Sequence, residues 1–176
     1  LHLLGVVAHQ QSRHAEAIDL ITRAIQVRND AAPFHHNLGE AFRATGDVEA
    51  ALAYYARAIE LRPNYADAHN NLGRALEMLG KPLDARAMYR RAIALEPEHA
   101  KAHFNLGLVS LLLGEFGTGW REYEWRWRVP EFAATHRVEE ELQRREARLV
   151  RVAHEALGFG AEVAHREVRQ RAVVVA

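Results

Sequence analysis

A short motif returns along the chain at a fixed interval of 34 residues. It reads HHNLG at residues 35–39, HNNLG at 69–73 and HFNLG at 103–107, with a partial copy, LLG, at 3–5. A period of this length is typical of proteins that stack one supersecondary unit many times, each unit contacting mainly its neighbours. The repeat therefore predicts an elongated stack rather than one globular core.

Each repeat contains the pattern of two helices. In the unit at residues 66–99, apolar and small residues at helical spacing predict a first helix over 66–79 and a second over 82–95. Gly80 follows the first helix, and Gly46 and Gly114 hold the same place in the neighbouring units. Glycine there is a usual helix stop, and Pro82 suits a first helical turn. Each unit is thus predicted to be a helix, a tight turn and a helix.

Small and bulky residues occupy fixed positions of the repeat. Small side chains allow two helices to approach closely, and bulky ones opposite them fill the remaining space. We expect these positions to form the interior of the stack. The small positions are Gly5, Gly39, Gly73 and Gly107, then Ala17, Ala51 and Ala85, then Ala24, Ala58 and Ala92; the bulky ones are Leu4, Leu38, Leu72 and Leu106, then Ile21, Tyr55, Tyr89 and Tyr123.

The small residue after Leu, the Ala-x3-Tyr-x2-Ala pattern at 51–58 and 85–92, and Pro63 and Pro97 at the unit ends resemble the tetratricopeptide repeat family. The resemblance covers residues 1–130 and implies an all-α, right-handed superhelical solenoid of antiparallel helix pairs with about three and a half to four units. The expected units are 1–31, 32–65, 66–99 and 100–130.

The last unit is irregular, and the repeat is absent after Pro130. All three Trp lie within residues 120–127, and Trp125 holds the position of Arg23, Arg57 and Arg91, so we expect it to face outward. An outward Trp packs under a following segment, which we favour, or marks a contact surface. Residues 131–176 are expected to form a charged helical cap or tail. Because the chain opens on Leu1 in the middle of a repeat, without a signal peptide, we expect a fragment of a longer protein.

The composition narrows the class of function. Lys plus Arg and Asp plus Glu both number 23, which argues against a nucleic-acid-binding surface. No apolar run is long enough to span a membrane. The chain has no Cys, which excludes disulfides and cysteine-ligated zinc and fits a cytoplasmic protein. No catalytic or cofactor-binding motif is recognisable, so we expect no enzyme activity and no cofactor.

His35, His69 and His103 form a column that a metal site would need to bring together. Zinc requires nitrogens about 2.0–2.1 Å from the ion, whereas equivalent residues of stacked units lie roughly 10 Å apart. We therefore expect these histidines to pack as aromatic wedges between helices and not to bind metal.

The candidate binding residues are led by the column Asn37, Asn71 and Asn105. A carboxamide both donates and accepts hydrogen bonds, as an extended peptide backbone does. The column is similar to the Asn ladders of O-linked N-acetylglucosamine transferase-type repeats, and that resemblance implies that these residues hold a peptide backbone in a concave groove. Other predicted groove residues, which change from charged to apolar along the stack, are His36, Glu40, Arg43, Asp67, Asn70, Arg74, Glu77, Lys101, Phe104 and Leu108.

The predicted function is a protein–protein interaction scaffold that binds an extended peptide segment. An alternative is that residues 119–127 resemble the junction at which bacterial repeats lead into a glycosyltransferase-like domain. The chain would then be the substrate-recruiting arm of a larger protein whose catalytic domain is absent here. Weak self-association of the stack is a third option that the sequence leaves open.

Overall fold

The structure is a computed structural model, and it describes residues 1–132, 144 and 148. The chain divides after Arg126, and the repeats lie in the first part, Leu1–Arg126. Apart from Glu131, Phe132, Arg144 and Arg148, the predicted cap at 131–176 lies outside the described residues.

The described repeats are entirely helical, as predicted. Each unit contributes two α-helices, and a short 3-10 helix follows the last pair. The helices are α1 (His2–Gln10), α2 (His14–Val27), α3 (Ala32–Ala44), α4 (Val48–Leu61), α5 (Ala66–Met78), α6 (Pro82–Leu95), α7 (Ala100–Leu112), α8 (Phe116–Tyr123) and η1 (Glu124–Arg128).

The turn inside each unit has the same geometry in all four copies. Gly46, Gly80 and Gly114 have φ of +86°, +70° and +78°, which confirms their predicted role in ending the first helices. In the third unit the Gly80 N–H donates to the Glu77 carbonyl at 2.9 Å and the Lys81 N–H to the Leu76 carbonyl at 2.9 Å, the pair of bonds that defines a Schellman motif. Ser12 holds the equivalent position in the first unit, with φ 61°.

The two helices of a unit pack through the small and bulky columns. A Cβ on Gly73 would lie 2.6 Å from Cε1 of Tyr89, so only glycine allows α5 and α6 to approach this closely. Tyr89 itself is fully buried. The predicted interior is wrong at one residue, Leu4, which is 61% exposed. In later units this column packs onto the preceding second helix, as Leu72 does beside Tyr55, and no described helix precedes α1.

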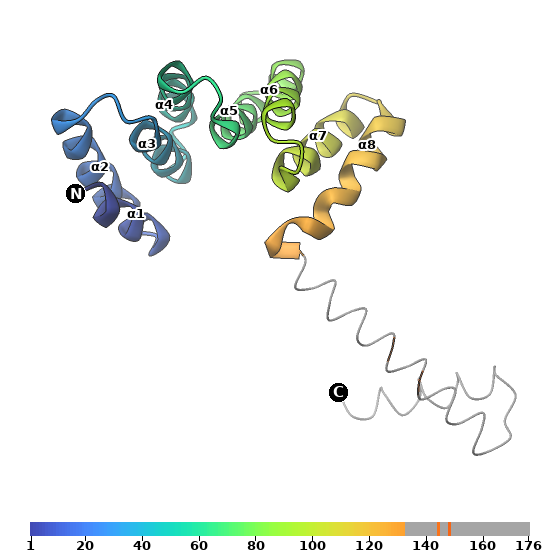
Figure 1. Ribbon diagram of the computed structural model, residues 1–176, viewed down its shortest axis with the longest axis horizontal. Coiled ribbons are helices and arrows are strands. Elements are labelled where there is room, and N and C mark those ends of the chain that lie inside the picture. The colour runs from blue at the N-terminus through green and yellow to red at the C-terminus, as the bar shows by residue number, and fades with distance from the viewer. Residues whose placement is uncertain (133–143, 145–147, 149–176) are drawn as a thin grey trace, which may run out of the picture. The chain divides into compact units, whose positions relative to one another are not determined.

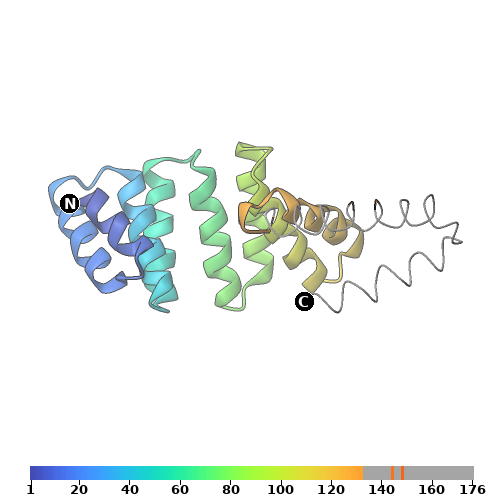
Figure 2. The ribbon, with the colours of Figure 1, turned by 90° about the horizontal axis from the view of Figure 1, so that it is seen from below.

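The pairs stack side by side to form a solenoid (Figures 1 and 2). Consecutive first helices contact one another, α1 with α3, α3 with α5 and α5 with α7. No such contact joins the consecutive second helices among α2, α4, α6 and α8, all of which the structure describes. The first helices therefore lie closer together and line the inner side of the arc, with α4 and α6 on the outer side (Figure 1).

The second helix of the fourth unit differs from its predecessors. α8 ends at Tyr123 and continues as η1, whose tighter winding changes the direction of the following side chains. Trp125 consequently does not face outward as predicted. Its ring stacks on His103 of α7, with centroids 3.8 Å apart and planes 5° from parallel. The predicted packing under a following segment concerns residues outside those described.

Candidate functional site

A chain of side-chain hydrogen bonds crosses the inner surface from α1 to α7. It is built from two adjacent columns of the repeat, the predicted Asn column and the residue immediately before it. The members, in order along the chain of bonds, are His2, Asn37, His36, Asn71, Asn70 and Asn105. We refer to these six residues as the inner ladder.

Bonds between units alternate with bonds within units. Between units, Nδ2 of Asn37 donates to Nε2 of His2 at 2.9 Å, Nδ2 of Asn71 to Nε2 of His36 at 2.9 Å, and Nδ2 of Asn105 to Oδ1 of Asn70 at 2.9 Å. Each unit is thus joined to its neighbour by one bond of the same kind.

Within units, Nδ2 of Asn70 donates to Oδ1 of Asn71 at 3.1 Å, and Nδ1 of His36 faces Oδ1 of Asn37 at 3.3 Å. Because Nε2 of His36 accepts from Asn71, the proton of its neutral ring lies on Nδ1, which faces both Oδ1 of Asn37 and the Tyr65 hydroxyl oxygen at 3.3 Å. All five donors therefore point from the C-terminal toward the N-terminal end of the stack.

Burial separates the two columns of the ladder. His36 is 9% exposed and Asn70 3%, so these two predicted groove residues serve the connection between units rather than an open surface. Asn37, Asn71 and Asn105 are half-buried. Burial also lowers the pKa of His36, partly opposed by Glu40, Asn37 and Asp67.

Glu40 and Arg43 form a closed polar cluster with Tyr55 in the second unit. Nη2 of Arg43 donates to Oε2 of Glu40 at 3.0 Å, and the Tyr55 hydroxyl donates to Oε1 of Glu40. Burial alone would raise the pKa of Glu40, but the bonds from Arg43 and Tyr55 outweigh it and lower the pKa. Burial, together with Glu40, raises the pKa of Tyr55. The charges of this cluster are satisfied internally.

The third unit exchanges the acid and the base of that cluster. Here the Tyr89 hydroxyl donates a hydrogen bond to Glu77. The pKa of Tyr89 is raised mainly by burial and secondly by this hydrogen bond. Arg74 occupies the position of Glu40 and is half-buried. No carboxylate among the described residues forms an ion pair with the Arg74 guanidinium.

Asp67 and Lys101 lie at the start of α5 and α7, and both are exposed. Oδ1 of Asp67 accepts from Nε2 of His99 at 3.1 Å, and this bond lowers the pKa of Asp67. The Asp67–His99 bond connects the third unit to the loop that begins the fourth.

The fourth unit presents apolar side chains at the corresponding positions. Phe104 replaces the His or Asn that precedes the Asn column, and Leu108 replaces Glu40 and Arg74. Leu108 is 41% exposed and Phe104 is half-buried. The predicted change from charged to apolar residues along the stack is therefore present among the described residues of α3, α5 and α7.

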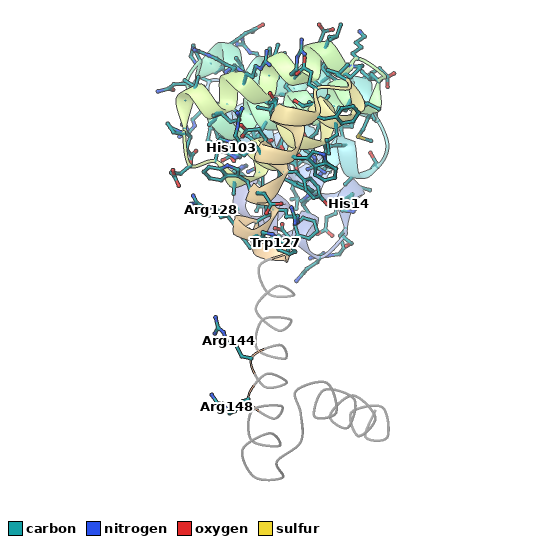
Figure 3. All side chains as sticks on the ribbon, turned by 90° about the vertical axis from the view of Figure 1, so that its right-hand side faces the viewer. His14, His103, Trp127, Arg128, Arg144 and Arg148 are labelled. Carbon is teal, nitrogen blue, oxygen red and sulfur yellow. The ribbon has the colours of Figure 1, made fainter. Side chains whose placement is uncertain are left out.

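The His35, His69 and His103 column is buried between helices, as predicted. Nε2 of each ring bonds the carbonyl oxygen six residues earlier, at 2.8, 3.0 and 2.9 Å. Nδ1 of His103 also contacts Oε2 of Glu122 at 2.5 Å; the residue His103 is labelled in Figure 3. Within the described part of the chain, no group of three or more His, Asp or Glu is arranged to hold a metal ion, and no helix is long and apolar enough to cross a membrane.

The hydrogen-bonding partners of the Asn column were not predicted from the sequence. A signal was present, because His2, His36 and Asn70 also recur every 34 residues directly before Leu3, Asn37 and Asn71. Two adjacent polar columns on inward-facing helices indicate bonds between units. The period alone does not reveal whether a polar side chain meets a neighbour or a ligand.

Comparisons with known proteins agree with this architecture. Residues 39–80 match the family model described as TPR repeat, and residues 66–99 match the model described as tetratricopeptide repeat. No sequence among the curated proteins matches the chain significantly.

Solved structures give the same picture. The crystal structure of MamA is 23% identical, with a TM-score of 0.67, over 76% of this chain and 78% of that one. The first TPR of Spaghetti (RPAP3), bound to the HSP90 peptide SRMEEVD, is 25% identical, with a TM-score of 0.62, over 64% of this chain and 90% of that one. Residues 39–99 thus match tetratricopeptide repeat models, and the solved structures share the fold of stacked helix pairs.

Proposed function

We propose that the inner surface of the solenoid binds an extended peptide segment of a protein partner. The observation that carries the proposal is the row of half-buried carboxamides Asn37, Asn71 and Asn105, one in each of three consecutive units. A carboxamide has two N–H groups and two lone pairs; the ladder bonds of Asn37 and Asn71 use one of each, and that of Asn105 uses one N–H. The remaining hydrogens and lone pairs are suited to the alternating N–H and C=O groups of a peptide.

The spacing of the row also suits an extended chain. Successive units lie roughly 10 Å apart, which is about three residues of extended backbone. The peptide recorded in the RPAP3 structure supports peptide binding as the class of function for a related fold. The likeness to O-linked N-acetylglucosamine transferase-type repeats rests on the Asn column alone. A cytoplasmic setting and a binding role without catalysis or cofactor are parts of this proposal.

Mapping the contact surface tests the proposal better than deleting the Asn column, because Asn→Ala substitutions also break the bonds between units. A random peptide library is selected against the whole chain, and bound peptides are titrated into ¹⁵N-labelled protein. We expect chemical-shift changes to concentrate on α3, α5 and α7. Changes confined to the outer helices α4 and α6, or no selected peptides at all, would contradict the proposal.

A second candidate function is the substrate-recruiting arm of a larger glycosyltransferase-like protein. It is favoured by the sequence GWREYEWRW at residues 119–127, which lies in α8 and η1. A glycosyltransferase-like domain in the same reading frame would support this role. The peptide-binding surface would then serve to recruit the substrate. Weak self-association remains a third proposal, motivated by Leu3, Leu4 and Val7, which are exposed on α1.

A further inference from the structure

We propose that the inner surface between α5 and α7 recognises an acidic side chain and, two residues away, an apolar side chain of the same extended segment. Arg74 faces the acidic group, Phe104 and Leu108 contact the apolar one, and Asn105 accepts a backbone N–H between them. This inference rests on the proposed function and gives the chemistry of the ligand at one part of that surface.

The acidic preference follows from the unpaired charge of Arg74. In the second unit both charged positions are satisfied by the Glu40–Arg43 pair at 3.0 Å. In the third unit Glu77 is bonded to Tyr89, and Arg74 has no ion-pair partner among the described residues. A half-buried guanidinium interacts more strongly with a carboxylate than a fully exposed one, and it can hold it through two N–H donors.

Asn105 supplies the open hydrogen-bond acceptor. Every Oδ1 earlier in the inner ladder receives a donor from the ladder itself, from His36, Asn70 or Asn105. In the fourth unit the residue before the Asn column is Phe104, whose side chain has no hydrogen to donate. No donor to Oδ1 of Asn105 occurs among the described residues, so this oxygen is available to a backbone N–H of the ligand.

The apolar preference follows from α7. Phe104 and Leu108 are four residues apart, hence neighbours on one helix face. Leu108 is 41% exposed although the equivalent residues of the two preceding units, Glu40 and Arg74, are polar. An exposed Leu beside a Phe on the inner surface favours contact with an apolar side chain.

The helix geometry brings the three groups together. The Asn105–Asn70 bond of 2.9 Å fixes α7 against α5 at this level. Arg74 lies one turn beyond Asn70 and Leu108 almost one turn beyond Asn105, so both project on the same side of that bond. Side chains on one face of an extended segment are about 7 Å apart, and the flexible stem of Arg74 covers the rest of the roughly 10 Å between units.

A charge-reversal selection tests the inference. The random library is displayed as N-terminal fusions, so that no peptide carries a free C-terminal carboxylate and only acidic side chains are selected. Wild type should enrich Asp or Glu two residues from Leu, Ile, Met or Phe. The variant Arg74→Glu should instead enrich Lys or Arg at the acidic position. Arg91→Glu, the same change at an exposed residue of α6, is the matched control and should keep the wild-type preference.

Affinities give the quantitative arm. A synthetic peptide with a central Glu-Ala-Leu should lose about tenfold or more in affinity for Arg74→Glu, and its Lys-Ala-Leu counterpart should gain. Circular dichroism checks folding, and Arg74→Gln, which keeps the stem without the charge, replaces the reversal variant if that variant is unfolded.

The outcomes separate this inference from the proposed function. Peptides that map to α3, α5 and α7 without an acidic preference, or a preference that Arg74→Glu leaves unchanged, would overturn the inference alone. Absence of any inner-surface binding would overturn both.

Discussion

At the scale of single residues, equivalent buried nitrogen atoms of the histidine column differ in whether they have a hydrogen-bond partner. Nδ1 of His103 meets Glu122, but the equivalent Nδ1 atoms of His35 and His69 are buried with no hydrogen-bond partner in the described structure. Glu122 belongs to the irregular fourth unit, and Tyr54 and Met88 hold its position in the two units before it. A substitution at one position of a repeat can therefore satisfy or leave unsatisfied a group on the neighbouring helix.

Ser110 offers the clearest stability test at this scale. Its side chain is fully buried, and its Oγ has no hydrogen-bond partner in the part of the chain that the structure describes. The equivalent residues Ala8, Phe42 and Leu76 are apolar. An unpaired buried hydroxyl costs about 1–3 kcal/mol, so Ser110→Ala should raise the free energy of unfolding by about 1 kcal/mol. Chemical denaturation measures the difference.

The exposed Thr45→Ala is a suitable comparison for Ser110→Ala. The Thr45 hydroxyl donates to the Phe42 carbonyl at 2.8 Å near the surface, so its removal should be neutral or slightly destabilising. A loss of stability in Ser110→Ala would mean that the buried hydroxyl is satisfied after all.

At the scale of the helix pair, the turn between first and second helices repeats with one exception. Ser12 has φ 61° where the other three units have glycine. Its hydrogen bonds are nevertheless the same, Ser12 N–H to the His9 carbonyl and Arg13 N–H to the Ala8 carbonyl, both at 2.9 Å. The backbone geometry of the turn is kept in spite of the strain that a side chain adds there.

Ser12→Gly should therefore stabilise the first helix pair. A left-handed conformation costs a non-glycine residue about 1–2 kcal/mol, while glycine loses about 0.5–1 kcal/mol more chain entropy on folding. The expected net gain is about 0.5–1 kcal/mol, measured by thermal or urea unfolding. The reverse change, Gly80→Ser, should cost a similar amount in the third unit. Equal stability of all three proteins would show that the turn tolerates both residues.

At the scale of the whole solenoid, the inner ladder is the polar connection that recurs at each junction between the described units. It crosses α1, α3, α5 and α7 with every donor pointing the same way. Neighbouring units also meet through apolar packing, such as Leu72 against the cluster that contains Tyr55, and through single ion pairs such as Asp67–His99. The ladder bonds add a directional term that recurs at each of these interfaces. Stability of a solenoid is largely a sum of such interfaces.

His36 makes this connection sensitive to pH. Its pKa is lowered from the ordinary 6.5 by burial. Protonation would also place a second donor opposite Asn71. The unfolded chain therefore takes up the proton at higher pH than the folded one. Stability from His36 is complete above about pH 6.5 and is lost as pH falls from there through the folded pKa.

The variant His36→Asn isolates this effect, because Asn70 performs the same ladder role in the next unit without titrating. Between pH 7.5 and 5.5 the wild type should lose more stability than the variant, by at most about 1.4 kcal/mol for each unit of pKa difference. Comparing urea unfolding of both proteins at both pH values cancels the other histidines. Parallel pH dependence would show that His36 does not titrate differently in the folded state.

Much of the site was predictable at the level of columns but not of contacts. The repeat placed Asn37, Asn71 and Asn105 on one face, and the half-burial of all three fits that prediction. The ladder partners His36 and Asn70 were predicted as ligand contacts. Their burial depends on the distance between units, which the repeat pattern does not show. The outward direction of Trp125 was wrong because α8 ends in η1, and a shift from α to 3-10 winding is not visible in a helical pattern.

The sequence by itself determined the number and kind of the elements: a 34-residue period, glycine at the turns and small residues at close approaches specify stacked helix pairs, because these constraints are local to one unit. Only the tertiary structure decided which polar groups are already used. Arg43 is paired with Glu40 on its own helix, whereas Glu77 bonds to Tyr89 and Arg74 has no ion-pair partner among the described residues. Whether Asn105 keeps an open oxygen depends on how neighbouring units are set against each other. That relation is fixed by the packing of many side chains at once and is not encoded at any single position.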